Sequence, residues 1–154
     1  MEQKINYEIC VGTVADIEAI AQFQVDMAQE SEGTQLDHER VLNGVTAAMN
    51  DVAKGTYIVA KVEGKTIGSL MLTREWSDWT NRWYWWIQSV YVQPEYRGKG
   101  AYRAMYQKVK ELAKEQGITQ IRLYVDKTNY PAQKVYQKLG MQECHYFMYE
   151  EVIG

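Results

Sequence analysis

The chain has 154 residues, which is long enough for one folded domain and short for two. A hydrophobic content of 46% and a charged content of 24% are typical of a globular protein, and the formal net charge of −3 argues against nonspecific binding to nucleic acid. No apolar run approaches the length of a membrane span, and the N-terminus lacks the apolar segment of a secretory signal, so we expect a cytoplasmic protein without a membrane partner.

The first half of the chain alternates strand and helix patterns. Thr13 and Asp16 have the spacing of a capping box, and Asp37 is a suitable N-cap for a second helix, which Gly55 closes. The predicted elements are a strand over residues 4–11, helices over about 14–30 and 37–51, and strands over 57–62 and 66–72.

The second half begins with a hairpin signal, because residues 63–65 form a tight turn between two strand patterns. Residues 75–86 hold all five tryptophans, and Gly117 is the expected C-terminal cap of a long helix. The predicted elements are a strand over 83–92, a helix over about 101–116, a strand over 121–125 parallel to the preceding one, a short helix from Pro131 to near Leu139, and one or two strands within 142–152. These elements predict an α/β domain with a mixed sheet and helices on both faces.

The turn Arg97-Gly98-Lys99-Gly100 joins the strand over 83–92 to the long helix. Backbone N–H groups at a helix N-terminus attract anions, and two glycines allow a phosphate to approach the backbone closely. The sequence is neither a P-loop nor a dinucleotide fingerprint. Taken alone, the turn is either an ordinary surface connection or an anion site.

Residues 97–102 are Arg-Gly-Lys-Gly-Ala-Tyr, and residues 129–141 hold Asn129, Ala132, Tyr136, Lys138 and Gly140. Together these two motifs resemble the GNAT superfamily of N-acetyltransferases. Residues 97–102 resemble the pyrophosphate loop Gln/Arg-x-x-Gly-x-Gly/Ala of that family. Residues 129–141 resemble its motif Asn-x-x-Ala-x-x-x-Tyr-x-Lys-x-Gly-Phe, with Asn129, Tyr136 and Lys138 in place and Met141 instead of Phe. The helix and strand that separate the two motifs in the family are also predicted here.

The resemblance implies a single N-acetyltransferase domain over residues 1–154, with a mixed, largely antiparallel sheet, a splayed parallel strand pair and helices on both faces. It implies acetyl-CoA as cosubstrate and no metal, with the pyrophosphate on the N–H groups of residues 98–103 and the pantetheine arm paired with the strand before them. The cofactor-binding residues so implied are Val90, Tyr91, Val92, Arg97, Gly98, Lys99, Gly100, Ala101, Tyr102, Arg103, Asn129 and Tyr136.

The reaction implied is transfer of the acetyl group to a primary amine by direct attack, without a covalent intermediate. By the resemblance, Tyr136 is the general acid that protonates the CoA thiolate, and Asn129 hydrogen-bonds pantetheine or orients the site; core packing is the other interpretation of Tyr136. Lys138 is a surface residue or a partner of a CoA phosphate.

The sequence departs from the family pattern at two positions. Tyr102 replaces Gly or Ala, and we expect its side chain to point outward. Gln88 stands where many relatives carry a catalytic Glu, so the general base must come from elsewhere or act through water. The candidates for the base or for an acidic mouth that receives a cationic amine are Glu30, Glu32, Glu75 and Asp78, each of which is otherwise a solvated surface group.

Several alternatives stay open at this point. The tryptophans either pack in the core and hairpin or form an aromatic wall for the acceptor. A non-catalytic acyl-CoA-binding or regulatory module on the same fold is the alternative function, and a sugar-binding module is a third. The acceptor is a small amine or a protein amine, and both a homodimer and an acyl group longer than acetyl are left open. Cys10 and Cys144 are expected to be reduced thiols.

Overall fold

A computed structural model describes residues 4–154 of the chain, and these residues form two compact units. The larger unit ends at Leu123 and contains the β-sheet and three α-helices. The smaller unit, Tyr124–Gly154, contains one α-helix. The expectation of one domain over residues 1–154 stays a prediction.

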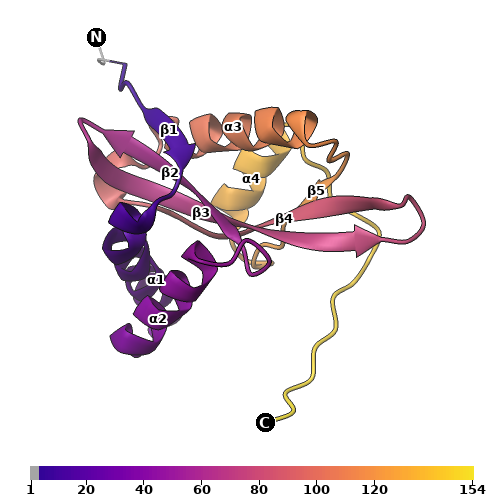
Figure 1. Cartoon of the computed structure of the whole chain (residues 1–154), viewed down its shortest axis with the longest axis horizontal. Coiled ribbons are helices and arrows are strands. Elements are labelled where there is room, and N and C mark those ends of the chain that lie inside the picture. Colours follow the sequence, from indigo (N-terminus) through magenta and orange to yellow (C-terminus); the bar gives the residue numbers. More distant parts are fainter. Residues whose placement is uncertain (1–3) are drawn as a thin grey trace. The chain divides into compact units, whose positions relative to one another are not determined.

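The larger unit is built on a five-stranded sheet whose strands are neighbours in chain order (Figure 1). The first four strands pair antiparallel, and the fifth pairs parallel to the fourth. This arrangement confirms the predicted mixed, largely antiparallel sheet with one parallel pair. The strands are β1 (Glu8–Val11), β2 (Thr56–Val62), β3 (Lys65–Ser77), β4 (Arg82–Val92) and β5 (Ile121–Arg122).

Local sequence signals mark several helix ends correctly. The carboxylate of Asp37 accepts hydrogen bonds from the backbone N–H groups of Glu39 and Arg40 at 3.0 and 3.3 Å and so caps the second helix. Gly117 follows the third helix in the left-handed conformation, with φ 71°. A short 3₁₀ turn, Val14–Asp16, precedes the first helix. The helices are α1 (Ile17–Glu32), α2 (His38–Met49), α3 (Ala101–Glu115) and α4 (Tyr130–Lys138).

Helices cover both faces of the sheet, as predicted (Figure 1). On one face, Tyr57 and Val59 of β2 belong to a core cluster with Ile20 of α1 and residues of α2. The alternate β2 residues Ile58 and Ala60 are also buried and face the other side, where α3 packs. None of the helices among residues 4–154 has the length and apolar content of a membrane span.

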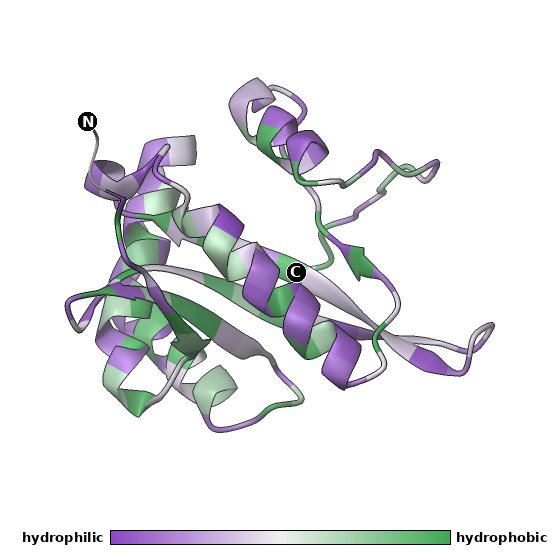
Figure 2. Cartoon of the chain, turned by 90° about the horizontal axis from the view of Figure 1, so that it is seen from above, coloured by the Kyte–Doolittle hydropathy of each residue, from purple (hydrophilic) through white to green (hydrophobic). Residues whose placement is uncertain are grey.

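The buried stripe of α3 consists of residues spaced four apart. Ala101, Met105, Val109 and Ala113 are buried, whereas most of the remaining residues of the helix are hydrophilic (Figure 2). This pattern determines which face of α3 packs on the sheet and which face is left to solvent.

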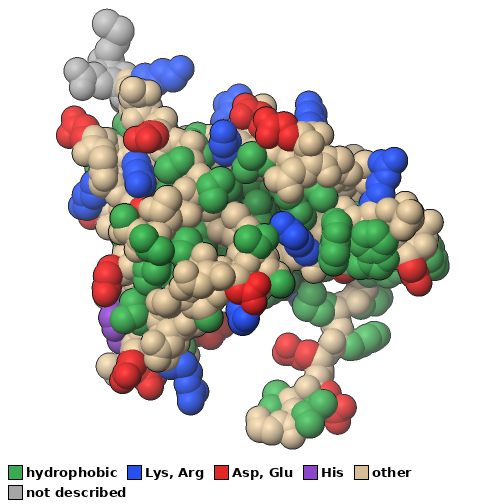
Figure 3. Space-filling view, viewed as in Figure 1, with side chains coloured by type: hydrophobic (Ala, Val, Ile, Leu, Met, Phe, Trp, Pro, Cys, Tyr) green, Lys and Arg blue, Asp and Glu red, His purple; other side chains and the backbone are tan. Residues whose placement is uncertain are grey.

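β3 and β4 extend past β2 as a hairpin (Figure 1). β2 pairs with β3 only as far as Leu72, whereas β3 and β4 stay paired to the end of the hairpin. Apolar side chains gather over this extension in the space-filling view (Figure 3). Trp76, Trp79 and Trp83 are 48%, 91% and 43% exposed, whereas Trp85 is buried. The tryptophan segment is therefore divided between the core and an exposed hairpin.

Three predicted strands are shorter than expected or absent. β1 begins at Glu8 rather than at residue 4, and β5 ends at Arg122 rather than at residue 125. No strand is present among residues 124–154, so the prediction of strands within 142–152 is wrong. The apolar residues there satisfy the local signal, but a strand also needs a hydrogen-bonded neighbour, and the smaller unit contains none.

The end of α2 also differs from the prediction. The helix ends at Met49, well before Gly55. The carboxylate of Asp51 accepts hydrogen bonds from the backbone N–H of Ala53 and the ammonium group of Lys54, and this local turn competes with helical continuation.

Candidate active site

The glycine-rich turn lies between β4 and α3, as the sequence predicts, and a short 3₁₀ turn, Pro94–Tyr96, separates it from the end of β4. Gly98 and Gly100 have φ of 72° and 86°, a left-handed conformation that glycine adopts without strain. Gly100 is the N-cap of α3, and no side chain among the described residues caps this helix end. The N–H groups of its first turn therefore keep their capacity to bind an anion.

A hollow of about 990 Å³ lies beside this turn. Lys99 and Arg103, two of the residues predicted to bind the cofactor, line it, and Lys4 and Tyr7 form part of its wall. The Tyr7 hydroxyl donates a hydrogen bond of 3.0 Å to the carbonyl oxygen of Lys99. No sequence signal marks Tyr7, because this contact joins residues 92 positions apart.

Arg97, the first residue of the turn, points away from the helix end. Its Nε donates a hydrogen bond of 2.8 Å to the carbonyl oxygen of Val92, and one Nη forms an ion pair of 2.7 Å with Glu30 on α1. Its guanidinium group lies over the ring of Tyr91, at 5.2 Å from the centroid. The side chain thus makes its contacts with β4 and α1.

β4 has a strand on both sides only in its first half. β5 pairs with Trp85 and Trp86, and among the described residues no strand pairs with the same edge of β4 from residue 87 to 92. The segment predicted to pair with pantetheine, residues 90–92, therefore has an edge without a strand neighbour. An extended ligand could add to such an edge through backbone hydrogen bonds.

A β-bulge interrupts β4 just before this segment. Ser89 and Val90 stand opposite the single residue Leu70, between the pairs Met71–Gln88 and Ser69–Tyr91. Ser89 has φ 53°, an uncommon conformation for a residue other than glycine. Because a bulge leaves one residue out of the ladder, backbone groups at this point are available for another partner. The sequence does not reveal the bulge, since the residues that form it are ordinary strand formers.

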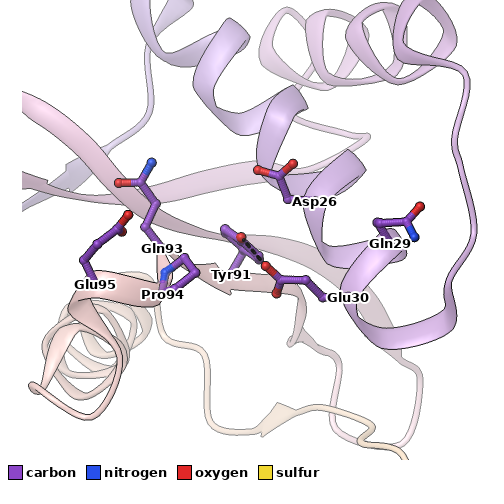
Figure 4. Close-up of a pocket in the computed structure, with 7 residues that line it drawn as sticks. All are labelled: Asp26, Gln29, Glu30, Tyr91, Gln93, Pro94 and Glu95. Atoms are coloured by element: carbon purple, nitrogen blue, oxygen red, sulfur yellow. Dashed lines mark hydrogen bonds between the residues drawn. The ribbon is translucent and has the colours of Figure 1, made fainter.

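Glu30 lies at the edge of a pocket of about 380 Å³ between α1 and the end of β4 (Figure 4). One of its carboxylate oxygens accepts a hydrogen bond of 3.0 Å from the hydroxyl of Tyr91. The hydrogen bond from Arg97, helped by that from Tyr91, lowers the pKa of Glu30 against the opposing effect of burial. Burial and the contact with Glu30 raise the pKa of Tyr91 to about 12, so its hydroxyl stays a donor. Asp26 and Glu95 also line the pocket, which is acidic.

Glu75 and Gln88 lie on one face of the β3–β4 pair. The carboxylate of Glu75 accepts hydrogen bonds from the indole N–H of Trp86 at 3.1 Å and from Arg122 at 2.8 Å. The amide of Gln88 donates a hydrogen bond of 2.6 Å to the hydroxyl of Thr73. Register pairing and the alternation of strand residues place these side chains on the face that also carries Tyr91. The structure thus places two of the predicted acceptor-site residues on one face and adds Arg122, a partner of Glu75 that sequence analysis missed.

Glu32 and Asp78 are not brought into this group. Glu32 is the last residue of α1, and Asp78 lies in the turn of the hairpin; both are exposed. These positions agree with the other interpretation of Glu32 and Asp78, that each is a solvated surface group.

We expected the side chain of Tyr102 to point outward, but it packs along α3. Its ring stacks on that of Tyr106 one turn further along α3, with centroids 6.0 Å apart and an interplanar angle of 13°. Its hydroxyl group is buried. The stacking directs the ring toward Tyr106 rather than into solvent.

The smaller unit carries Asn129 and Tyr136. Asn129 is the N-cap of α4, and its side-chain oxygen accepts a hydrogen bond of 3.3 Å from the backbone N–H of Ala132. Tyr136 is half-buried on α4, and burial raises its pKa above 10.0, which keeps the phenol protonated at neutral pH. Lys138 is exposed in the last helical turn.

Comparisons with known proteins give a consistent result. The model of the Acetyltransferase (GNAT) family matches residues 17–141. The chain is similar to the thialysine N-epsilon-acetyltransferase of Bos taurus, with 38% identity over 68 residues, which are 44% of this chain and 39% of that protein. The match thus spans about two fifths of the length of that curated relative.

Two solved structures extend the comparison. A possible acetyltransferase from Clostridium difficile 630 is 42% identical and superposes with a TM-score of 0.89 over 96% of this chain and 99% of that one. A predicted acetyltransferase from Clostridium acetobutylicum, solved with acetyl-CoA, is 18% identical and shares the fold with a TM-score of 0.75 over 95% of this chain and 96% of that one.

Proposed function

Since the chain belongs to the GNAT family of acetyltransferases, we propose that it transfers an acetyl group from acetyl-CoA to a primary amine within a ternary complex. One observation carries the proposal: an uncapped helix N-terminus, bordered by Lys99 and Arg103, follows a strand whose outer edge has no strand neighbour from residue 87 to 92 among the described residues. A pyrophosphate would bind the N–H groups of residues 98–103, and the pantetheine arm would lie along residues 90–92.

In the proposed reaction the amine nitrogen forms a bond to the acetyl carbon, and the carbon–sulfur bond breaks. The CoA thiolate takes a proton from Tyr136, whose raised pKa keeps that proton in place before the reaction. The amine loses a proton to Glu75 through water. Glu75 is proposed because it shares a sheet face with Gln88, which cannot itself accept a proton.

The acceptor is proposed to be a small amine or a protein amine, held over the polar face that carries Glu75 and Gln88. The cytoplasmic location and the homodimer stay predictions from the sequence.

Release of the CoA thiol from acetyl-CoA, measured across a panel of small amines and peptide amines, tests the proposal. At least one amine should accelerate release. If CoA binds and no amine accelerates its release, the non-catalytic acyl-CoA-binding module replaces the enzyme.

The role of Tyr136 has its own test. Tyr136→Phe should lower kcat by about 100-fold, the lower range of general acid catalysis, with little change in acetyl-CoA binding. Tyr130→Phe is the matched control, because Tyr130 is exposed on the same helix. Equal turnover of the two variants would remove Tyr136 from the role.

A further inference from the structure

Arg97 opens the phosphate-binding turn, yet it uses its donors elsewhere. The backbone N–H of Gln93 donates to the carbonyl oxygen of Ile67 on β3, so the alternation of an antiparallel ladder directs the carbonyl of Val92 toward the outer edge of β4. Arg97 Nε donates to that carbonyl at 2.8 Å. The side chain therefore closes a short loop from the end of β4 to the start of the turn.

Glu30 holds the other side of the same guanidinium group. Its two carboxylate oxygens are divided between Arg97, at 2.7 Å, and the hydroxyl of Tyr91, at 3.0 Å. Tyr91 is buried and stacks on Phe23 of α1, with centroids 5.2 Å apart. The turn is thus connected through one carboxylate to a ring that is fixed in the core.

We propose that Glu30, Tyr91 and Arg97 form a positioning network through which α1 presets the phosphate-binding turn for acetyl-CoA. The network fixes the residue that precedes two left-handed glycines, so less conformational entropy is lost when the N–H groups close on a phosphate. This proposal rests on the proposed function, because it takes acetyl-CoA as the ligand of the turn.

Electrostatics alone predicts the opposite effect for Glu30, which makes the proposal testable. Removing a carboxylate near an anion site should strengthen anion binding through reduced repulsion. Removing a positioning contact should weaken it. Glu32→Gln is the matched control, because Glu32 is exposed on the same end of α1 and its side chain takes part in no hydrogen bond or ion pair among residues 4–154.

The experiment measures the Kd of acetyl-CoA by calorimetry, and KM and kcat with a saturating amine, for the full chain and its variants. Glu30→Gln and Tyr91→Phe should raise both Kd and KM about two- to fivefold, the range that a partly exposed ion pair contributes, and KM should change more than kcat does. Glu32→Gln should bind acetyl-CoA as tightly as the wild-type chain or slightly more tightly. A Glu30→Gln variant that binds as tightly as Glu32→Gln would overturn the network.

Arg97→Lys separates positioning from charge. Lysine keeps the positive charge but cannot donate in two fixed directions, so the network predicts the same weakening as in Glu30→Gln. The double variant should lose no more affinity than either single one, because both remove the same connection. Wild-type affinity in Arg97→Lys would show that Arg97 acts as a charge only.

Two controls keep the outcomes distinct. Thermal unfolding midpoints close to that of the wild-type chain exclude loss of the folded state as the cause of weaker binding. A wild-type chain that does not bind acetyl-CoA overturns the proposed function itself, whereas wild-type binding that Glu30→Gln leaves unchanged overturns the network alone.

Discussion

The two ends of α1 are each connected to the sheet by one carboxylate, but in different surroundings. At the N-terminal end, Asp16 is 2% exposed and accepts hydrogen bonds from the backbone N–H of Thr13 at 2.9 Å and the hydroxyl of Thr66 at 2.8 Å, with Lys61 Nζ at 3.3 Å. At the C-terminal end, the side chain of Glu30 is 43% exposed and its partner Arg97 is 47% exposed.

This difference in burial separates two kinds of contribution. Removing one member of a buried, hydrogen-bonded charge pair leaves its partners without compensation and is strongly destabilising. An exposed ion pair contributes little to the free energy of unfolding because water and salt screen it. The Asp16 end of α1 should therefore stabilise the fold, whereas the Glu30 end should act on the geometry of the glycine-rich turn.

The largest expected effect is at the buried end. Asp16→Ala should lower the free energy of unfolding by about 3 kcal/mol, because Lys61 and Thr66 lose a buried partner. Urea denaturation measures this change. Glu18→Ala, an exposed position in the first turn of the same helix, should change stability by less than about 0.5 kcal/mol. Equal effects of the two substitutions would contradict the assignment.

The carboxylate of Asp16 should also make the free energy of unfolding depend on pH in the acid range. Burial raises the pKa of Asp16, but the hydrogen bonds from Thr13, Thr66 and Lys61 outweigh this effect, and the net pKa is lowered. A lowered folded-state pKa contributes stability above the unfolded value of about 3.9, and this contribution disappears as the pH falls through the folded-state pKa. The stability difference between the wild-type chain and Asp16→Asn, measured in urea, should therefore narrow below pH 4. A constant difference down to pH 2 would show that Asp16 is not ionised in the folded chain.

The exposed end should give a smaller change. Glu30→Ala should lower the free energy of unfolding by less than about 1 kcal/mol, because the ion pair with Arg97 is nearly half exposed. Thermal unfolding at low and high salt measures it, and high salt should reduce the difference further. A loss as large as that of Asp16→Ala would remove the distinction between the two ends.

The smallest change in the free energy of unfolding is expected at Ser69, which contacts neither Asp16 nor Glu30. Ser69 is buried next to Val59 and Tyr91 in the ladder, and its hydroxyl has no hydrogen-bond partner among the described residues. Ser69→Ala removes an unsatisfied polar group, so it should leave stability unchanged or raise it by about 1 kcal/mol. Urea denaturation is again the measurement, and a clear loss of stability would indicate a hidden partner for this hydroxyl.

Much of the fold is predictable because its signals are local. Asp37 as N-cap, Gly117 as C-terminal cap and the turn at Glu63 and Gly64 depend on residues within a few positions of each other. The strands predicted within residues 142–152 are wrong for the complementary reason, since pairing depends on a distant neighbour.

The candidate site divides in the same way. The glycine-rich turn, its place at the start of α3 and the short helix α4 follow from residue type and spacing, and the family follows from the two motifs. The bulge at Ser89, the contact of Tyr7 with Lys99 and the orientation of Arg97 do not, because each is determined by a partner far away in the chain.

The sequence by itself determined the class of the fold, the position of the glycine-rich turn and the family, since backbone preferences and hydrophobic periodicity act over short ranges. Only the tertiary structure decided what the charged side chains near that turn contact. Arg97 stands just before the N-terminus of α3, but its guanidinium group pairs with a carboxylate on α1. Packing of α1 on β4 places Glu30 where the guanidinium group reaches it. The partner of such a long side chain depends on which distant elements the fold brings near it. Spacing in the sequence could therefore identify the turn but not the contacts of its first residue.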